Sequence, residues 1–581
     1  MKQKINKNLL VFGFIGTYIV VALLPLLFSG YYSDDMVNSV IRPTQELEGG
    51  TFFKYYVSAN KSWISANGRL FPVSSFLTGL IYYYSNNLSA YKIIILLLVI
   101  IDIFLFGYFI KLLTNDKYLS YLLMLVVPSF FQYRLYHDPI LSFGGLLQIL
   151  FLMLLLSLIF LQKFLISRKY SYLAVSVIFF NLCLYSYEVS FVLLPVWLFL
   201  IFQRRGNFKR ALALTYPFLL SFLLAVTLNV LARFIWRETS ATGYIGTKFN
   251  FNIAAILRTF YLQLGSAIPL SYYLGNPSRI FNHTISYLLL NFKLLYGLIM
   301  SIFTIAYVNL SKRVRFEIEW KNFVIPGIIF FLFPAFLISL SDKYQQELNR
   351  YGFGMGYLPV YIEYFGLLMI FAGSLLLLLK STESARVRKF ISFILLISLN
   401  LILLVNLESN SVVVDKANID LFYRRTALEH SLENNILGGV PENSKILIVD
   451  QYIYDPYPPY IVSDFKGWAS YGNRWKNRAL VYMHSGKRVA VFDRLSDLIG
   501  GSNIQNVQNG KVDCSKDNDY LLMITSYPEE YHVKEGRVLF GKIKCILMNK
   551  TDISKAQLEI NEKKIYDDRK KEMIDYSGSH K

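Results

Sequence analysis

Apolar runs long enough to cross a lipid bilayer recur along most of this chain, and they constrain its fold more than any other feature. The runs begin near residue 9 and end near residue 407 of a 581-residue sequence, in which hydrophobic residues make up 54%. A transmembrane helix needs about 20 predominantly apolar residues. The sequence therefore predicts a polytopic α-helical membrane domain over residues 1–407.

Lys and Arg in the short loops between these runs set the predicted orientation, because cytoplasmic loops are enriched in basic residues. The same bias accounts for the formal net charge of +20, so we expect a membrane lipid environment and no nucleic acid partner. The basic loops all face inward only if two stretches, 71–84 and 251–273, stay outside as interfacial helices. About eleven spans result, with the N-terminus in the cytoplasm and the C-terminus outside. They are expected at residues 9–28, 90–112, 118–134, 139–161, 170–187, 189–203, 211–232, 284–310, 322–340, 357–379 and 390–407.

The composition changes near residue 408, where charged residues and Asn become frequent. Short strand-like runs follow, with helical patterns between some of them. These runs cover residues 445–450, 488–492, 520–525 and 538–549. Residues 408–581 are therefore predicted to form a soluble α/β or α+β domain outside the cell membrane, with a charged tail from residue 564.

An acidic pair, Asp34 and Asp35, directly follows the first apolar run. At the outer membrane surface a carboxylate is hydrated and can act as a base. An ionisable cluster beside hydrocarbon is costly unless it is solvated or paired, which makes the pair a functional candidate. The alternative is a water-facing turn that follows a helix.

Other polar residues fall in the predicted outer loops, a distribution that suits an outward-facing reaction chamber. Glu188 has only a tight turn between two apolar runs, so its carboxylate needs an Arg or hydroxyl partner. A histidine beside an aspartate, as His137 is beside Asp138, is more often a satisfied hydrogen-bonded pair than a ligand. No cysteine–histidine metal pattern is present. The candidates in these loops are Arg69, Arg134, His137, Asp138, Glu188, Lys343, Tyr344 and Arg350.

Taken together, these features resemble the GT-C glycosyltransferases, which are membrane enzymes that use polyprenyl-phosphate-linked sugars. The resemblance rests on the acidic pair after span one, the long first outer loop with interfacial helices, the acidic loop that enters span four, and the outer C-terminal domain. It covers residues 1–407. It implies that Asp34 or Asp35 is the general base or orients the acceptor, and that Asp138 is the second-loop acid. Members of the family differ in metal use, so a divalent cation stays an open alternative.

The chemistry of such a transfer sets the remaining expectations. The donor brings its own leaving group, so the enzyme must deprotonate an acceptor hydroxyl and stabilise the departing phosphate with cations. Four basic residues are expected to bind the donor phosphate on chemical grounds, namely Arg69, Arg134, Lys343 and Arg350. His137, Glu188 and Tyr344 complete the expected substrate-binding set.

The expected activity is an inverting transfer of a sugar to a cell-envelope glycan, polymer or lipid. Two other kinds of protein share the many spans and the intramembrane charges. One is a transporter or flippase, and the other is a polysaccharide polymerase for lipid-linked glycans.

Overall fold

In the computed structural model the chain divides into two compact units, which are described separately. Unit 1 holds residues 1–29, 56–81 and 85–414, and unit 2 holds residues 30–55, 82–84 and 415–581. The description covers residues 7–85, 87–135, 137–205, 208–236, 248–275, 294–315, 319–420, 429, 432–450, 474–493, 511–512, 520–526, 531–534, 537–540, 543–549 and 558–559.

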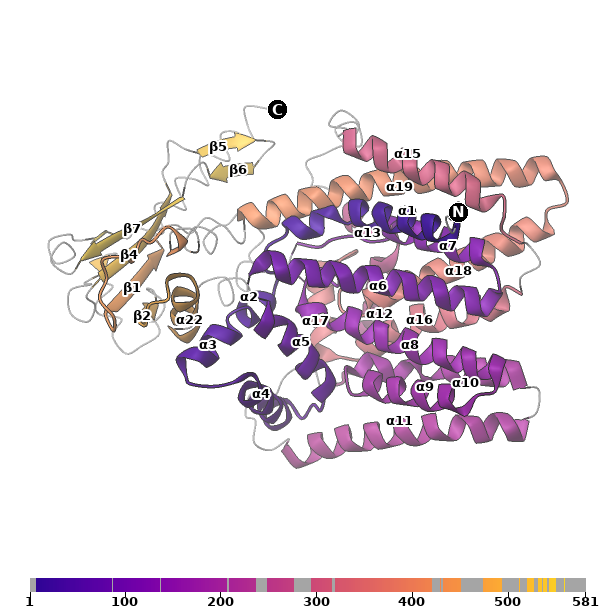
Figure 1. The fold of residues 1–581 in the computed structure, drawn as a ribbon, viewed down its shortest axis with the longest axis horizontal. Helices are drawn as coiled ribbons and strands as arrows, with labels where there is room; N and C mark the ends of the chain where they lie inside the picture. The colour runs from indigo at the N-terminus through magenta and orange to yellow at the C-terminus, as the bar shows by residue number, and fades with distance from the viewer. Residues whose placement is uncertain are drawn as a thin grey trace, which may run out of the picture. The chain divides into compact units, whose positions relative to one another are not determined.

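Unit 1 is a bundle of long helices that run roughly along one direction (Figure 1). Among the residues described, seven helices are long and apolar enough to cross a membrane. These are α6 (Leu88–Thr114), α8 (Leu146–Ser167), α11 (Phe208–Trp236), α15 (Leu294–Ser311), α16 (Lys321–Ser339), α18 (Val360–Ser381) and α19 (Ala385–Asp420).

Four further predicted spans overlap shorter helices. These are α1 (Lys7–Ala22), α7 (Lys117–Val126), α9 (Tyr170–Leu184) and α10 (Leu194–Arg205). Each predicted span thus contains a helix among the residues described, whereas the count of eleven spans stays a prediction. The two stretches kept outside the membrane form short helices, α5 (Pro72–Tyr84) and α12 (Ile253–Ala267), and their interfacial position also stays a prediction.

Local sequence sets where the helices begin and end. Asn87 caps α6, and its side chain accepts a hydrogen bond of 2.8 Å from the Ala90 amide. Asn115 ends that helix in the left-handed conformation, and Asp116 then caps α7 through the amides of Tyr118 and Leu119. Short polar side chains at these positions satisfy the helix-end amides and make a tight reversal between two antiparallel helices.

Small residues let the central helices approach closely. A Cβ built on Gly327 of α16 would lie 2.9 Å from the Gly366 carbonyl oxygen, and one on Gly366 of α18 would lie 2.7 Å from the Gly327 carbonyl oxygen. Side chains here would push α16 and α18 apart. Small residues at such crossings are characteristic of helix packing in membranes.

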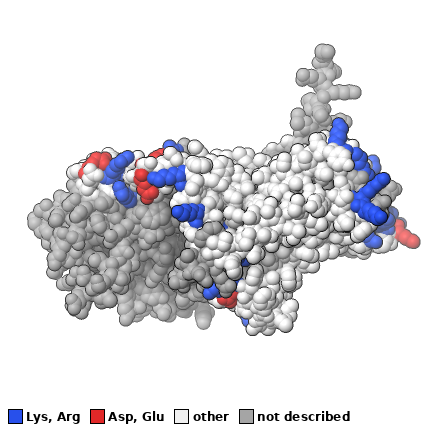
Figure 2. Space-filling model, turned by 90° about the horizontal axis from the view of Figure 1, so that it is seen from below, with Lys and Arg blue, Asp and Glu red and all other residues white. Residues whose placement is uncertain are grey.

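Charge is distributed unevenly over the bundle. Figure 2 shows a flank free of charged side chains, with a group of Lys and Arg at one end of it and charged side chains of both signs toward the other end. Large apolar side chains are exposed on the flank, such as Leu223 and Val230 of α11, which are each 58% exposed. The predicted basic loops connect helices at the end where the N-terminus lies, and α17 (Asp342–Tyr351) lies at the other end (Figure 1).

Unit 2 contains a four-stranded sheet in the order β2-β1-β4-β7. Strand β1 (Lys445–Asp450) pairs in parallel with β2 (Ala490–Asp493) and β4 (Tyr520–Ser526), and β7 (Ile543–Asn549) runs antiparallel to β4. Helix α22 (Arg474–Ser485) lies between β1 and β2 in the chain, as a parallel connection requires. Three predicted strand segments are confirmed, whereas the fourth, 538–549, holds two strands that belong to different sheets. The class of the whole domain stays a prediction.

The remaining strands of unit 2 form two separate ladders. Strand β3 (Lys511–Val512) pairs with β8 (Leu558–Glu559), and β5 (Tyr531–Lys534) pairs with β6 (Arg537–Phe540). The predicted charged tail, 564–581, lies outside the described residues.

The first loop contributes to unit 2. Two short helices follow the first span, α2 (Asp35–Asn38) and α3 (Ile41–Leu47). Val40 between them is buried in one hydrophobic cluster with residues of the C-terminal part of the chain. The other buried members are Leu432, Leu437, Val440, Ile446, Ala479, Leu480, Val481 and Val489. Helix α3 packs on α22, so this domain is assembled from both ends of the sequence.

Candidate functional site

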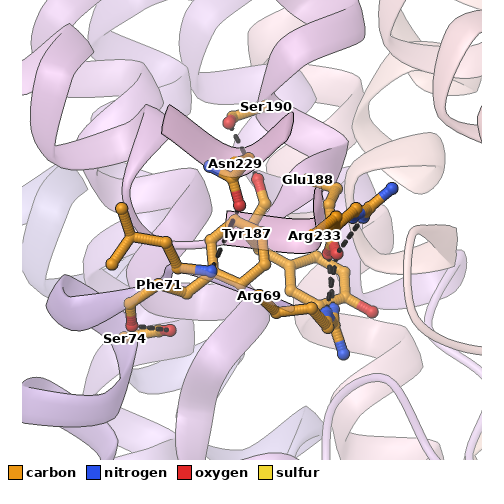
Figure 3. Close-up of polar contacts among 9 residues, drawn as sticks. Arg69, Phe71, Ser74, Tyr187, Glu188, Ser190, Asn229 and Arg233 are labelled. Atoms are coloured by element: carbon orange, nitrogen blue, oxygen red, sulfur yellow. Dashed lines mark hydrogen bonds and ion pairs between the residues drawn. The ribbon is translucent and has the colours of Figure 1, made fainter. Parts of the chain in front are cut away.

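An ion pair in unit 1 joins two predicted site residues that are 119 positions apart. Arg69 follows α4 (Phe52–Asn67), and Glu188 begins the 3-10 helix η4 (Glu188–Leu193). The Arg69 Nε and Nη2 atoms donate to the two Glu188 carboxylate oxygens at 2.7 and 2.5 Å (Figure 3). This bidentate arrangement is the strong form of an Arg–carboxylate pair. The expectation that Glu188 needs an Arg or hydroxyl partner is confirmed.

Aromatic rings hold the Arg69 guanidinium in place. Its central carbon lies 5.3 Å from the ring centroids of Trp63 and Phe71 and 5.4 Å from that of Tyr187. Rings at this distance attract a cation through their quadrupoles. Only 8% of the Arg69 side chain is exposed, so Arg69 is a fixed charge.

A second arginine, Arg233 of α11, shares the same carboxylate, and sequence reasoning did not select it as a site residue. Its Nη2 atom lies 3.4 Å from Glu188 Oε1, and 31% of its side chain is exposed. Its buried Nε atom has no hydrogen-bond partner among the described residues. Two arginines and one glutamate leave this cluster with a net charge of +1.

The chain between α4 and α5 is built to bring these charges together. Gly68 has φ of +60°, and a Cβ there would lie 2.8 Å from the Arg233 Cα. The next amides anchor the segment, since Leu70 donates to the Asn229 side-chain oxygen at 3.2 Å and Val73 donates to the Tyr185 carbonyl at 3.2 Å. Glycine is therefore required for both its conformation and its lack of a side chain.

Arg134 has surroundings that favour a structural role over the predicted phosphate binding. The side chain is buried, and each guanidinium nitrogen donates within the protein. The acceptors are the carbonyls of Gly354 (3.1 Å), Gln132 (3.1 Å) and Ser266 (2.8 Å) and the Tyr364 hydroxyl (3.1 Å). These hydrogen bonds tie the loop that contains Arg134 to α12, to the segment after α17 and to α18.

Asp138, the predicted second-loop acid, caps its own loop. Its buried carboxylate accepts backbone hydrogen bonds from Arg134 (2.6 Å), Ile140 (2.7 Å) and Leu141 (2.6 Å). Burial raises the pKa of Asp138 to about 6, although the charge of Arg134 and these amides lower it. A carboxylate with both oxygens engaged in this way is a structural cap, which argues against the predicted catalytic role.

Three other predicted residues do come together at the end of the bundle that holds α17. The His137 ring stacks on Tyr357 with centroids 4.6 Å apart, and the Tyr344 ring lies 5.5 Å from that of Tyr357. Lys343 pairs with Glu347 at 3.6 Å, and the Tyr357 hydroxyl donates to the same glutamate. Burial, reinforced by the charge of Lys343, lowers the pKa of His137 to about 3. Tyr357 and Glu347 were missed because neither breaks an apolar pattern.

The acidic pair belongs to unit 2. Asp35 is buried and begins α2, and its carboxylate accepts a hydrogen bond of 2.5 Å from the Tyr82 hydroxyl. Asp34 is half-buried. Sequence reasoning did not connect Tyr82 with this acid, because a Tyr-Tyr-Tyr run gives no signal for a hydrogen bond to a distant carboxylate.

The described residues test two further expectations only in part. Arg350 lies in α17, but its side chain is outside the described part of the structure. Within the ranges described, no three His, Cys, Asp or Glu side chains form a group able to hold a metal ion. The divalent cation therefore stays an open alternative with no ligand set in that part of the chain.

The fold and these charges define a polytopic helical membrane protein with a cationic cluster at the end of the bundle opposite the basic loops. No protein-family model matches the chain, and no curated protein matches it. Among solved structures it is similar to the crystal structure of ArnT from Cupriavidus metallidurans bound to undecaprenyl phosphate. The two chains share 12% identity with a TM-score of 0.35, over 91% of this chain and 97% of that chain. A match at this TM-score does not define the function, which is therefore inferred from the residues of the site.

Proposed function

We propose that this protein is a GT-C-like glycosyltransferase that moves a sugar from a polyprenyl-phosphate carrier to a cell-envelope glycan, polymer or lipid on the outer face of the membrane. The observation that carries the proposal is the Arg69–Glu188–Arg233 cluster. It has a net positive charge, and it lies at the end of an apolar bundle where a lipid phosphate would sit.

The two arginines have different tasks in this proposal. Arg69 is held by Glu188 and three rings, so it acts as a fixed positive charge that keeps the cluster in shape. Arg233 is more exposed and has donor capacity left, since only one weak contact to Glu188 engages it among the described residues. Arg233 is therefore the group that binds the phosphate, and it stabilises the negative charge that develops as the sugar leaves.

The acidic pair supplies the base. The carboxylate of Asp34 or Asp35 takes the proton from the acceptor hydroxyl, and the oxygen attacks the anomeric carbon as the bond to phosphate breaks. The half-buried Asp34 is the better candidate for contact with an acceptor. Asp35 is buried and engaged by Tyr82, which suits a residue that orients the turn.

The test is sugar transfer by purified protein in lipid, from a panel of radiolabelled polyprenyl-phosphate sugars. Asp34→Asn is expected to lower kcat by about 100-fold or more, the usual effect of losing a general base, with donor binding retained. Arg233→Gln is expected to weaken donor binding about tenfold, which corresponds to about 1.4 kcal/mol. Arg258→Gln, which alters an exposed arginine of α12, serves as the matched control.

The results separate the rival functions. If the wild-type protein turns over no donor and all variants bind the donor equally, the proposed glycosyltransferase function is wrong. A flippase or transporter would then be indicated if the protein moves a fluorescent polyprenyl-phosphate lipid between leaflets. A polymerase would be indicated by products that lengthen with time from a single lipid-linked glycan.

A further inference from the structure

The Asp34–Asp35 turn is connected to the C-terminal domain within a few residues. Val40 is five residues beyond Asp35, and only 2% of it is exposed, inside the hydrophobic cluster that includes Leu480 of α22 and Ile446 of β1. Leu47 at the end of α3 packs against the same cluster. The short segment between Asp35 and Leu47 thus contributes Val40 to this cluster and packs Leu47 against it.

A second contact fixes the other side of the turn. The Gly30 amide donates to the Asn418 side-chain oxygen at 3.0 Å, and these residues are 388 positions apart. Internal hydrogen bonds then stiffen the chain between Gly30 and Val40. The Asp35 amide donates to the Tyr32 carbonyl at 2.9 Å, and the Thr44 hydroxyl donates to the Val40 carbonyl at 2.7 Å. The acidic turn is therefore anchored on both sides by residues from the C-terminal part of the chain.

We infer that the C-terminal domain positions the acidic pair, and that Val40 and Leu480 are positioning residues for the transfer reaction. This inference rests on the proposed function, because it assigns the domain to the base of that reaction. A catalytic carboxylate must be held in a narrow range of positions, and a small displacement of its support is costly to the rate. A turn of this length has no core of its own, so its buried side chains depend on residues that are distant in sequence.

The first arm of the test measures structure without substrate. In the full chain, Leu480→Asp introduces a buried charge into the shared cluster. We expect amide hydrogen exchange over residues 35–47 to rise by at least tenfold, while exchange in α6 and α8 stays as in the wild type. Arg478→Asp, an exposed position on the same helix, is the matched control and is expected to leave exchange unchanged. Leu480→Ala serves in its place if the charged variant does not fold.

The second arm measures kinetics on the same samples. Leu480→Asp and Val40→Asp are expected to lower kcat by at least tenfold with the donor KM within a factor of two. Val40→Ile, which keeps an apolar side chain at this position, is expected to retain the wild-type kcat. A variant with raised exchange but unchanged kcat overturns the positioning role, and unchanged exchange overturns the anchoring itself. A wild type that transfers no sugar overturns the proposed function, and the exchange result then stands as a separate test of the anchoring.

Discussion

At the residue scale, Arg69 and Arg134 were both predicted to bind the donor phosphate, but their surroundings differ. Arg134 is buried with all its guanidinium nitrogens on internal acceptors, so binding a phosphate would cost the hydrogen bonds that join four segments. Arg69 is also held, but in a cluster whose second arginine is partly exposed. A buried arginine whose donors are all hydrogen-bonded within the protein has a structural role. An arginine in a cluster with a net positive charge can contribute to binding an anion.

Asp138 offers a clear separation of structure from catalysis. Asp138→Asn removes the charge and leaves one acceptor oxygen where three amides now donate. We expect the free energy of unfolding to fall by about 1–3 kcal/mol, the usual cost of unsatisfied buried groups. Transfer per folded molecule should stay within a factor of three, measured beside thermal unfolding in the same detergent. A fully stable variant without activity would restore Asp138 as a catalytic acid.

His137 predicts a pH dependence of stability. Its pKa in the fold is about 3, below the ordinary value of 6.5, so the unfolded chain binds the proton first as the pH falls. His137 therefore lowers stability progressively from pH 6.5 towards 3. Asp138 acts in the opposite sense between about pH 6 and 4, because the fold raises its pKa to about 6.

The measurement for His137 is thermal unfolding from pH 7 to 4. His137→Phe keeps a ring against Tyr357 but cannot titrate, so its melting temperature should fall less steeply with acid than that of the wild type. An identical pH slope in both proteins would contradict the burial of a neutral imidazole. Lys343→Gln is a second check, since it removes the charge that reinforces the shift.

At the scale of elements, the site depends on short connections between helices. The segment from Gly68 to Val73 is held by α11 on one side and by the turn before η4 on the other. Its geometry places Arg69, which lies between α4 and α5, beside the carboxylate of Glu188 in η4. Helix α11 supplies Arg233 and η4 supplies Glu188, while the connection between α4 and α5 supplies Arg69.

Glycine at position 68 is the most sensitive point of that connection. Gly68→Ala combines a left-handed backbone with a clash against Arg233, and we expect it to destabilise the protein by about 2–4 kcal/mol. Gly49→Ala is the matched control, because Gly49 has φ of +66° with no atom within 4 Å of a built Cβ, and it should cost about 1–2 kcal/mol. Thermal unfolding of both variants gives the comparison. Equal losses would mean that the contact with Arg233 is unimportant.

At the scale of the whole molecule, the two ends of the bundle are expected to face opposite sides of the membrane. In a cysteine-free background, Ser384→Cys between α18 and α19 should react with a membrane-impermeant maleimide only after the cells are opened. Ser62→Cys on the exposed face of α4 should react in intact cells. Labelling of both positions in intact cells would overturn the predicted orientation.

Sequence reasoning recovered what is encoded locally. Long apolar runs predict helices, and short apolar runs near Lys445 and Tyr520 predict strands, because each follows from side chains a few residues apart. Glu188 revealed its need for a partner through its apolar neighbours. The identity of that partner lies 119 residues away, and such pairings depend on packing that no local pattern records. The Tyr82 contact to Asp35 was missed for the same reason.

The discontinuous construction of unit 2 also determines when its core can form during synthesis. Val40 leaves the ribosome early, while the last of its buried partners, Val489, is made more than 440 residues later. The segment around Val40 therefore lacks its buried partners until all the apolar helices of the bundle have been synthesised. A chain truncated between residues 420 and 489 contains every helix of the bundle but lacks part of the core around Val40, so it cannot complete the support of the acidic turn.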